Sequence, residues 1–229
     1  MPVDREHPAF EQPSDPNIRV WRYMNFAKYV SFLQTQSLYL PQVKVLAHAD
    51  PYEGTTTKKE FRKVESGDKI ALNSQKSRLL GLSTNYVSCW HLNESESHAM
   101  WQLYSSSYSE AVCIQTTYQK LGDALPDVPG VESSHYFIGK VKYINHHIDD
   151  MPSNNVFYPI MHKLKSFQHE REIRIVYWRR NPGTGNSNML DGYPTGILVP
   201  LNINKTIENI IISPTAANWF SETVKKCDS

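Results

Sequence analysis

Eight short segments rich in β-branched and aromatic residues constrain the fold of this chain most strongly. They cover residues 18–24, 37–41, 85–92, 109–117, 135–144, 167–180, 196–202 and 207–214. Several of them alternate apolar and polar residues, as strands do when one face is buried. Because no internal repeat or linker divides them, they predict one α+β domain with a mostly antiparallel, interrupted sheet flanked by helices.

Helical patterns and turn residues separate the predicted strands. Phe26, Tyr29, Val30 and Leu33 recur at helical spacing after Asn25, which is a suitable N-cap. Further helices are predicted over residues 56–80, after residue 93, over part of residues 156–167, and after Thr215 at the C-terminal end. Residues 1–17 hold four prolines and several charges, so we expect an extended N-terminal arm before a single domain of residues 18–229.

Composition limits the classes of protein that fit. With 229 residues and 40% hydrophobic residues the chain can bury a full core, and a net charge of +1 gives no overall preference for nucleic acid or anionic membranes. Three cysteines without a CxxC pair indicate reduced thiols. The chain shows no signal-peptide pattern and no apolar run of ~20 residues, so we expect a cytoplasmic protein without a membrane partner.

Charged residues cluster in the predicted strand over 167–180. If this segment is a strand throughout, Glu170, Glu172 and Arg174 share one of its faces. One interpretation is an exposed ladder of ion pairs, which stabilises a fold by only about 0–1 kcal/mol. The other is a cleft in which two neighbouring carboxylates bind a polar or cationic group and one of them serves in proton transfer.

The segment from residue 85 to residue 106 carries a second set of candidates. Ser88 and His91 lie on a predicted strand, and Met100, Trp101 and Tyr104 share one side of the helix that follows. Core packing is the simpler explanation of the three helical residues, and ligand stacking is the alternative. Neither this segment nor the rest of the chain matches a zinc pattern, an esterase elbow, a Walker motif or a dinucleotide fingerprint, so we expect no metal.

Six short motifs occur in an order that resembles a widespread family of bacterial and phage proteins defined by a domain of unknown function. The motifs are Trp21-Arg22-Tyr23, Ser37-Leu38-Tyr39-Leu40, Asp50-Pro51-Tyr52-Glu53, Val87-Ser88-Cys89-Trp90, Met100-Trp101-x-x-Tyr104 and Glu170-x-Glu172-x-Arg174. The resemblance covers about residues 20 to 220, which is nearly the whole predicted domain. The resemblance implies common ancestry but does not by itself supply an activity.

The order of Arg22 on an early strand, Ser88 on a middle strand and Glu172 on a late strand also resembles the ADP-ribosyltransferases. That resemblance implies an ADP-ribosyltransferase-like fold in which Arg22 holds the phosphates of NAD and Ser88 supports the nicotinamide-ribose pocket. It assigns to Glu172 the stabilisation of the oxocarbenium-like transition state, because a fixed carboxylate favours the positive charge that develops on the ribose. The three side chains must then converge in one cleft.

The same resemblance implies roles for the remaining candidates. Glu170 would orient the acceptor as a second catalytic residue, and Tyr23 or Trp101 would stack on the nicotinamide. NAD would be the substrate of a transferase or glycohydrolase acting as a toxin or anti-phage effector, with a protein or nucleic-acid acceptor that the sequence does not specify.

Two other functions remain open. The most basic segment could bind or process nucleic acid through Lys58, Lys59, Arg62, Lys63, Lys69, Lys76 and Arg78, although such segments are more often solvated helix faces. Alternatively, the chain is a non-catalytic interaction module in which residues 170–174 form a structural ion-pair ladder.

Overall fold

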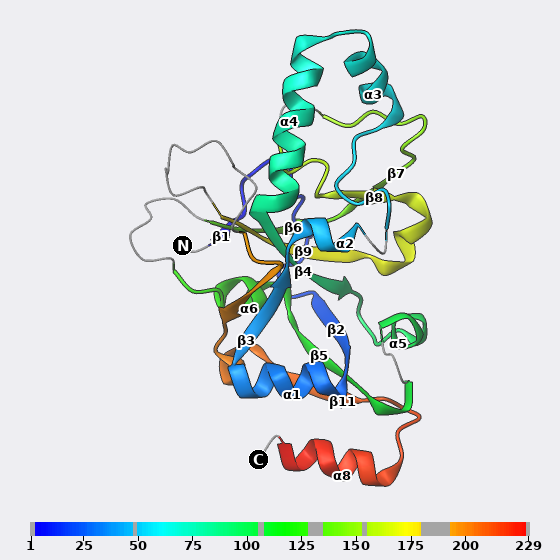
Figure 1. Cartoon of the computed structure of the whole chain (residues 1–229). Helices are drawn as coiled ribbons and strands as arrows, with labels where there is room; N and C mark the ends of the chain where they lie inside the picture. Colours follow the sequence, from blue (N-terminus) through cyan, green and yellow to red (C-terminus); the bar gives the residue numbers. More distant parts are fainter. Residues whose placement is uncertain are drawn as a thin grey trace.

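A seven-stranded sheet forms the centre of the protein (Figure 1). The computed structural model describes residues 3–47, 50–104, 108–127, 135–152, 155–179 and 193–227. In spatial order the strands are β1 (Val3–Asp4), β6 (Tyr136–Lys140), β9 (Glu172–Trp178), β4 (Asn85–Leu92), β2 (Arg19–Asn25), β5 (Ala111–Thr117) and β11 (Asn209–Ile212). Only the β1–β6 pair in this sheet is parallel, so the prediction of an α+β fold with a mostly antiparallel sheet is confirmed.

Two small sheets and a set of short helices complete the described structure. Strand β3 (Ser37–Pro41) pairs with β10 (Gly196–Pro200), and β7 (Lys142–Ile144) pairs with β8 (His162–Leu164). The α-helices are α1 (Phe26–Thr35), α2 (Val43–Leu46), α3 (Lys58–Glu65), α4 (Lys69–Thr84), α5 (His98–Tyr104), α6 (Tyr118–Asp123), α7 (Ile203–Thr206) and α8 (Asn218–Cys227). The 3₁₀ helices are η1 (Tyr108–Glu110) and η2 (Lys165–Glu170).

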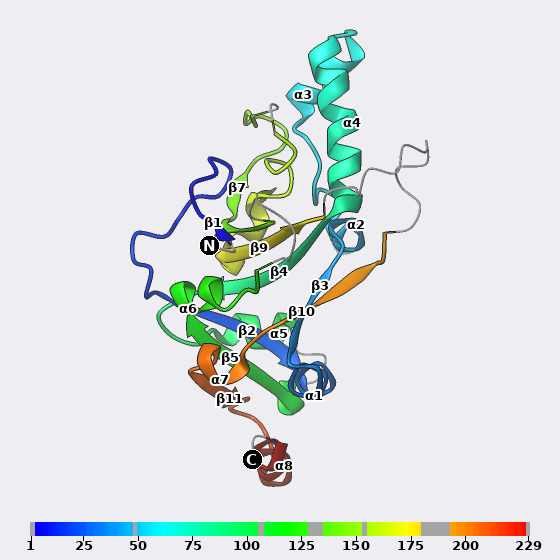
Figure 2. The same ribbon diagram turned by 90° about the vertical axis from the view of Figure 1, so that its left-hand side faces the viewer.

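The α3–α4 hairpin and α8 lie at opposite ends of the molecule, with the large sheet between them (Figures 1 and 2). Helix α1 begins as predicted, because the Asn25 side chain accepts a hydrogen bond from the backbone N–H of Lys28. Among the helices of the described residues, none has both the length and the apolar character required to cross a bilayer.

Strand register divides the side chains of the sheet between two faces. Ser88 of β4 lies opposite Ile175 of β9, whereas the next residue, Cys89, lies opposite Arg174. We call the side that carries Ser88 and Ile175 the first face, and the side that carries Cys89 and Arg174 the second face. Because successive residues of a strand point to opposite sides, this register fixes the face of every neighbouring side chain.

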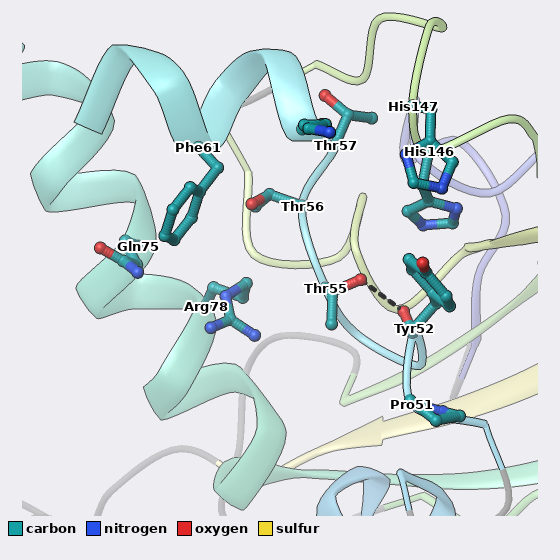
Figure 3. Close-up of a pocket in the computed structure, with 11 residues that line it drawn as sticks. Pro51, Tyr52, Thr55, Thr56, Thr57, Phe61, Gln75, Arg78, His146 and His147 are labelled. Carbon is teal, nitrogen blue, oxygen red and sulfur yellow. Dashed lines mark hydrogen bonds between the residues drawn. The ribbon is translucent and has the colours of Figure 1, made fainter. Parts of the chain in front are cut away.

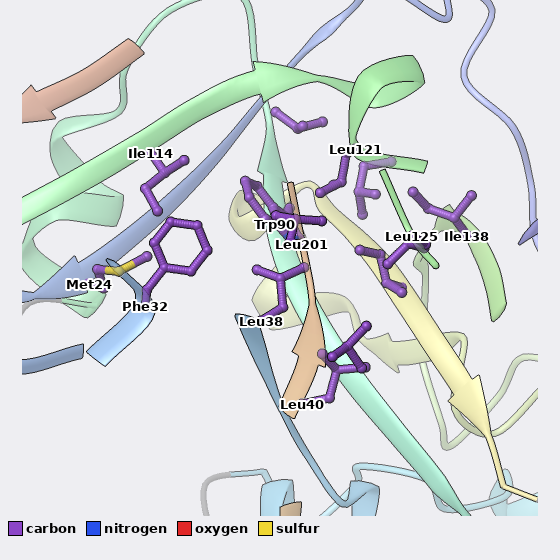
Figure 4. Packing of buried hydrophobic residues seen from close by; sticks show 14 of the residues in the cluster. Met24, Phe32, Leu38, Leu40, Trp90, Ile114, Leu121, Leu125, Ile138 and Leu201 are labelled. Carbon is purple, nitrogen blue, oxygen red and sulfur yellow. The ribbon is translucent and has the colours of Figure 1, made fainter. Parts of the chain in front are cut away.

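The first face packs the largest hydrophobic cluster among the described residues. The cluster gathers residues from the strands, from α1 and from the β3–β10 sheet (Figure 4), and it includes Met24, Phe32, Leu38, Leu40, Trp90, Ile114, Leu121, Leu125, Ile138 and Leu201. Smaller clusters cover the second face, one around Val87 and Phe137 and another around Trp21, Tyr23 and Trp101. Charged residues on the second face are therefore enclosed between apolar groups.

The N-terminal segment, predicted as an extended arm over residues 1–17, lies against the sheet where the structure describes it. Strand β1 adds to the edge of the sheet beside β6, and the side chain of Phe10 is buried. The backbone of Phe10 passes so close to Gly139 that a Cβ atom at Gly139 would lie 2.8 Å from it. Glycine at this position therefore allows the segment to pack onto β6.

The structure departs from two predictions between residues 156 and 180. The helix predicted over part of residues 156–167 is present only as the first residues of the 3₁₀ helix η2, because the segment before Lys165 forms turns and the short strand β8. The strand predicted from residue 167 begins only at Glu172, since η2 ends at Glu170 and Arg171 takes a left-handed conformation with φ of 41°. Glu170 consequently belongs to η2 and does not follow the alternation of the strand.

Candidate functional site

The guanidinium of Arg174 lies at the centre of a buried network of charged side chains on the second face. It is fully buried, and its Nε and Nη2 atoms donate to the two carboxylate oxygens of Glu172 at 2.6 and 3.0 Å. Its Nη1 atom donates to Glu53 Oε1 at 2.6 Å and also to the backbone carbonyl of Ile160. Arg174 therefore links β9 to the turn before α3 through charge-assisted hydrogen bonds.

A second cation, Lys163 of β8, connects Glu172 to Glu170. The Nζ atom of Lys163 lies 2.5 Å from Glu170 Oε2 and 3.5 Å from Glu172 Oε2. The hydroxyl of Tyr104, at the end of α5, donates to the other oxygen of Glu170 at 2.7 Å. We call Glu53, Lys163, Glu170, Glu172 and Arg174 the charged network.

The pKa values of the charged network follow from burial and from the cations. Burial alone would raise the pKa of Glu172, but Arg174 and Lys163 outweigh that effect and hold it at about 2. Burial raises the pKa of Glu53, because the attraction of Arg174 only partly compensates for its loss of hydration. The network holds three carboxylates against two cations, and the pKa of Glu53 moves in the direction opposite to that of Glu172.

We therefore expect Glu172→Gln to destabilise the protein much more than Glu53→Gln. The first change leaves Arg174 and Lys163 without their shared carboxylate, which should cost about 3–5 kcal/mol in the free energy of unfolding. The second removes a carboxylate that burial already makes harder to ionise and leaves Arg174 its pairing with Glu172, so the expected cost is smaller, on the order of 1 kcal/mol. Urea unfolding of both variants at pH 7 measures the difference in their free energies of unfolding. Equal losses of this free energy would contradict the opposite pKa directions of Glu53 and Glu172.

Arg22 and Ser88 do not converge with the predicted catalytic carboxylates. Both lie on the first face, where Arg22 Nη1 donates to Ser88 Oγ at 2.7 Å. The indole of Trp90 donates to the same oxygen at 3.0 Å. Glu172 lies on the second face, so the sheet separates it from Arg22 and Ser88. The single cleft implied by the resemblance to ADP-ribosyltransferases is absent from the described structure.

Tyr23 and Trp101 lie on the same side of the sheet as the charged network, but both are buried. Their rings pack edge to face with centroids 4.9 Å apart, and their exposed fractions are 7% and 1%. The Tyr23 hydroxyl accepts a hydrogen bond from the backbone of Ser97, and the Trp101 indole donates to Glu96. Neither ring offers an open surface for nicotinamide in this conformation, and core packing accounts for both.

Three important members of the site were not predicted as site residues. Lys163 was placed in a predicted helix, and Tyr104 was considered only as part of an apolar helix face. Glu53 was recognised only as the last residue of one of the six motifs. The Asp-Pro-Tyr-Glu motif marked Glu53, but no spacing rule could pair it with Arg174, because the two residues are 121 positions apart.

Cys89 and His91 flank the charged network on β4. Burial raises the pKa of the Cys89 thiol, which disfavours a reactive thiolate. The Nδ1 atom of His91 lies 2.6 Å from the backbone carbonyl of Glu170, and its buried Nε2 atom has no hydrogen-bond partner in the described structure. Within the described ranges, no three His, Cys, Asp or Glu side chains form a group that could hold a metal ion.

The fold and the site together define an α+β protein whose central sheet buries three carboxylates and two cations on one face. Comparison of the chain with models of known protein families, with curated proteins and with solved structures found no match in any of the three.

Proposed function

We propose that the chain is an enzyme that breaks an N-glycosidic bond, with NAD as its substrate and Glu170 as the carboxylate facing the reacting ribose. The observation that carries the proposal is the environment of Glu170. Lys163 and Tyr104 hold its two oxygens, and Tyr104 is 42% exposed, so Glu170 lies on the side of the charged network nearest to solvent. Glu172 is less suitable, because its main partner is the fully buried Arg174, whereas Glu170 is bonded to the partly exposed Tyr104.

The chemistry requires a carboxylate that is fixed before the reaction begins. Departure of nicotinamide leaves positive charge on the ribose, and a carboxylate already held in place stabilises that charge without reorganisation. Tyr104 and Lys163 supply this positioning, and the apolar groups around the network strengthen the electrostatic interaction. Buried ion pairs often contribute little net stability, so a network of five such groups is itself a reason to look for catalysis.

This proposal differs from the arrangement implied by the resemblance. It moves the main catalytic role from Glu172 to Glu170, and it leaves Arg22 and Ser88 out of the site because they lie on the first face. Membership of the bacterial and phage family remains part of the proposal and is supported by the six motifs, and a role as a toxin or anti-phage effector goes with it. An ADP-ribosyltransferase-like fold also remains a proposal, supported by the order of Arg22, Ser88 and Glu172 along the chain. The acceptor is water, a protein group or a nucleic-acid group.

Release of nicotinamide from NAD tests the proposal. We expect the wild-type protein to release nicotinamide and Glu170→Gln to lose about 100-fold or more of that rate, since the charge that stabilises the ribose is removed. The amide keeps the size of the side chain, so a folded variant with an unchanged melting temperature makes the comparison direct.

Ser88→Ala is the matched control on the first face. It should retain the rate of nicotinamide release as long as the protein is folded, because Ser88 is separated from Glu170 by the sheet. Loss of activity in folded Ser88→Ala together with full activity in Glu170→Gln would contradict the proposed site. A wild-type protein that releases no nicotinamide would instead favour the non-catalytic interaction module.

A further inference from the structure

A cavity of about 340 Å³ lies between the α3–α4 hairpin and the turns around residues 52 and 146 (Figure 3). Phe61, Gln75 and Arg78 line it on the hairpin side, and Tyr52, His146 and His147 line the opposite wall. We propose that this cavity binds a nucleoside monophosphate, with its base between the aromatic side chains and its phosphate against the cationic ones. The site is distinct from the charged network and does not depend on the proposed reaction.

The charges of the lining favour an anion. Lys58 and Arg78 contribute positive charge, and no Asp or Glu occurs among the lining residues that the structure describes. Arg78 uses Nη1 to donate to the backbone carbonyl of Gly54 at 3.1 Å, but its buried Nε has no hydrogen-bond partner in the described structure. A buried donor without a partner is costly, and a phosphate oxygen would satisfy it.

His146 gives independent evidence for a ligand. Its side chain lines the cavity and is only 2% exposed, and within the described structure neither ring nitrogen has a hydrogen-bond partner. A neutral imidazole carries one donor and one acceptor, and buried groups of this kind are bonded in the great majority of proteins. Figure 3 shows the ring beside Tyr52 and His147, facing the hairpin side of the cavity. A ligand with its own donors and acceptors would supply the missing partners.

The beginning of α3 gives the phosphate a further point of contact. Helix α3 starts at Lys58, and Thr57 caps it by accepting a hydrogen bond from the backbone of Glu60. The positive end of the helix dipole therefore meets the cavity at Thr57 and Lys58, which both line it. Lys58 at the start of α3 and Arg78 on α4 therefore both contribute positive charge to the cavity lining.

Aromatic rings provide surfaces for a base. The Tyr52 ring lies 5.3 Å from that of His146, and Phe61 is 48% exposed on the facing wall. Aromatic rings can stack on any nucleobase, so the aromatic lining favours a nucleoside phosphate over an aliphatic phosphate ester.

A mononucleotide fits the cavity better than a nucleic-acid strand does. A volume of about 340 Å³ is near the lower end for small-molecule sites. Two basic residues of α3 are already ion-paired, since Lys59 contacts Asp150 at 2.8 Å and Lys63 contacts Glu60. The hairpin consequently offers less free positive charge to an extended polyanion than its sequence suggests.

Calorimetric titration of the full chain with AMP and GMP, with adenosine and inorganic phosphate as partial ligands, tests the proposal. We expect at least one of the two nucleotides to bind, Arg78→Met to weaken binding about 10-fold or more, and Lys59→Met, which alters an ion pair outside the cavity, to leave it unchanged. His146→Phe should also weaken binding without lowering the melting temperature, because it removes two unsatisfied nitrogens and keeps a ring.

Several results would overturn the proposal. The first is that neither nucleotide binds at millimolar concentration. The second is that Arg78→Met binds the nucleotide as tightly as the wild type does. The third is that single-stranded RNA binds more tightly than the nucleotides, with a steep dependence on salt. Equal affinity for inorganic phosphate would remove the role of the base. Glu170→Gln should bind the nucleotide as the wild type does, so failure of this site and failure of the proposed reaction are distinguishable.

Discussion

Arg174→Met should lower the free energy of unfolding by about 3–5 kcal/mol, as much as we expect from the loss of its partner in Glu172→Gln. The guanidinium is fully buried, and its removal leaves the carboxylates of Glu172 and Glu53 without their main partner. For a chain of this length the loss corresponds to a fall of roughly 6–20 °C in melting temperature. Thermal unfolding followed by circular dichroism measures it.

Arg174→Lys and Arg22→Met are informative comparisons. Lysine keeps the charge but cannot bind Glu172 and Glu53 through a planar fork, so we expect it to recover only a small part of the loss. Arg22 donates to Ser88 and to a backbone carbonyl, both neutral, and its removal should cost less than that of Arg174. If Arg22→Met destabilises the protein as much as Arg174→Met, the ion pairs of Arg174 contribute no more to the free energy of unfolding than the neutral hydrogen bonds of Arg22.

Acid should destabilise the protein through Glu172. The pKa of this group is about 2 in the folded protein and near 4.5 in the unfolded chain, so its contribution is fully present above pH 4.5. It is lost as the pH falls towards 2, because the unfolded chain then binds a proton that the folded protein does not. The two pKa values correspond to a contribution of roughly 3 kcal/mol. Urea unfolding between pH 5 and pH 2 should show this loss.

Glu172→Gln isolates this contribution from the effect of other carboxylates. Its stability should fall less steeply than that of the wild type over the same pH range, since the titrating group is absent. NMR titration of the Glu172 carboxyl provides a direct measurement that does not require a stable variant. An apparent pKa above 4 in the folded protein would contradict the strong pairing with Arg174 and Lys163.

Most of the strands and helices could be predicted from local sequence, because each buries one face and its apolar residues therefore recur at the period of a strand or a helix. Strand β4 was predicted with its observed bounds, and the N-cap of α1 was identified at Asn25. The error at residues 167–171 has a specific cause. Arg171 adopts a left-handed conformation that non-glycine residues rarely take, and nothing in the alternation of Glu170 and Glu172 indicates it.

The candidate site was only partly predictable, because its composition depends on which strands become neighbours. Glu170, Glu172 and Arg174 are close in sequence and were recognised together. Which face Ser88 shares with its neighbours depends on the pairing of β4 with β9, and a register different by one residue would have placed it on the face that carries Glu172. Short motifs do not contain that information.

The pairing of Arg174 with Glu53 has a consequence for the order of folding. The two residues are separated by 121 positions, and β4, α5 and β6 lie between them in the sequence. Bringing such distant segments together carries an entropic cost that local helices and hairpins do not. We therefore expect the ion pairs of the charged network to form late in folding, after the sheet has assembled. Interactions that form after the transition state lower the unfolding rate and have little effect on the folding rate.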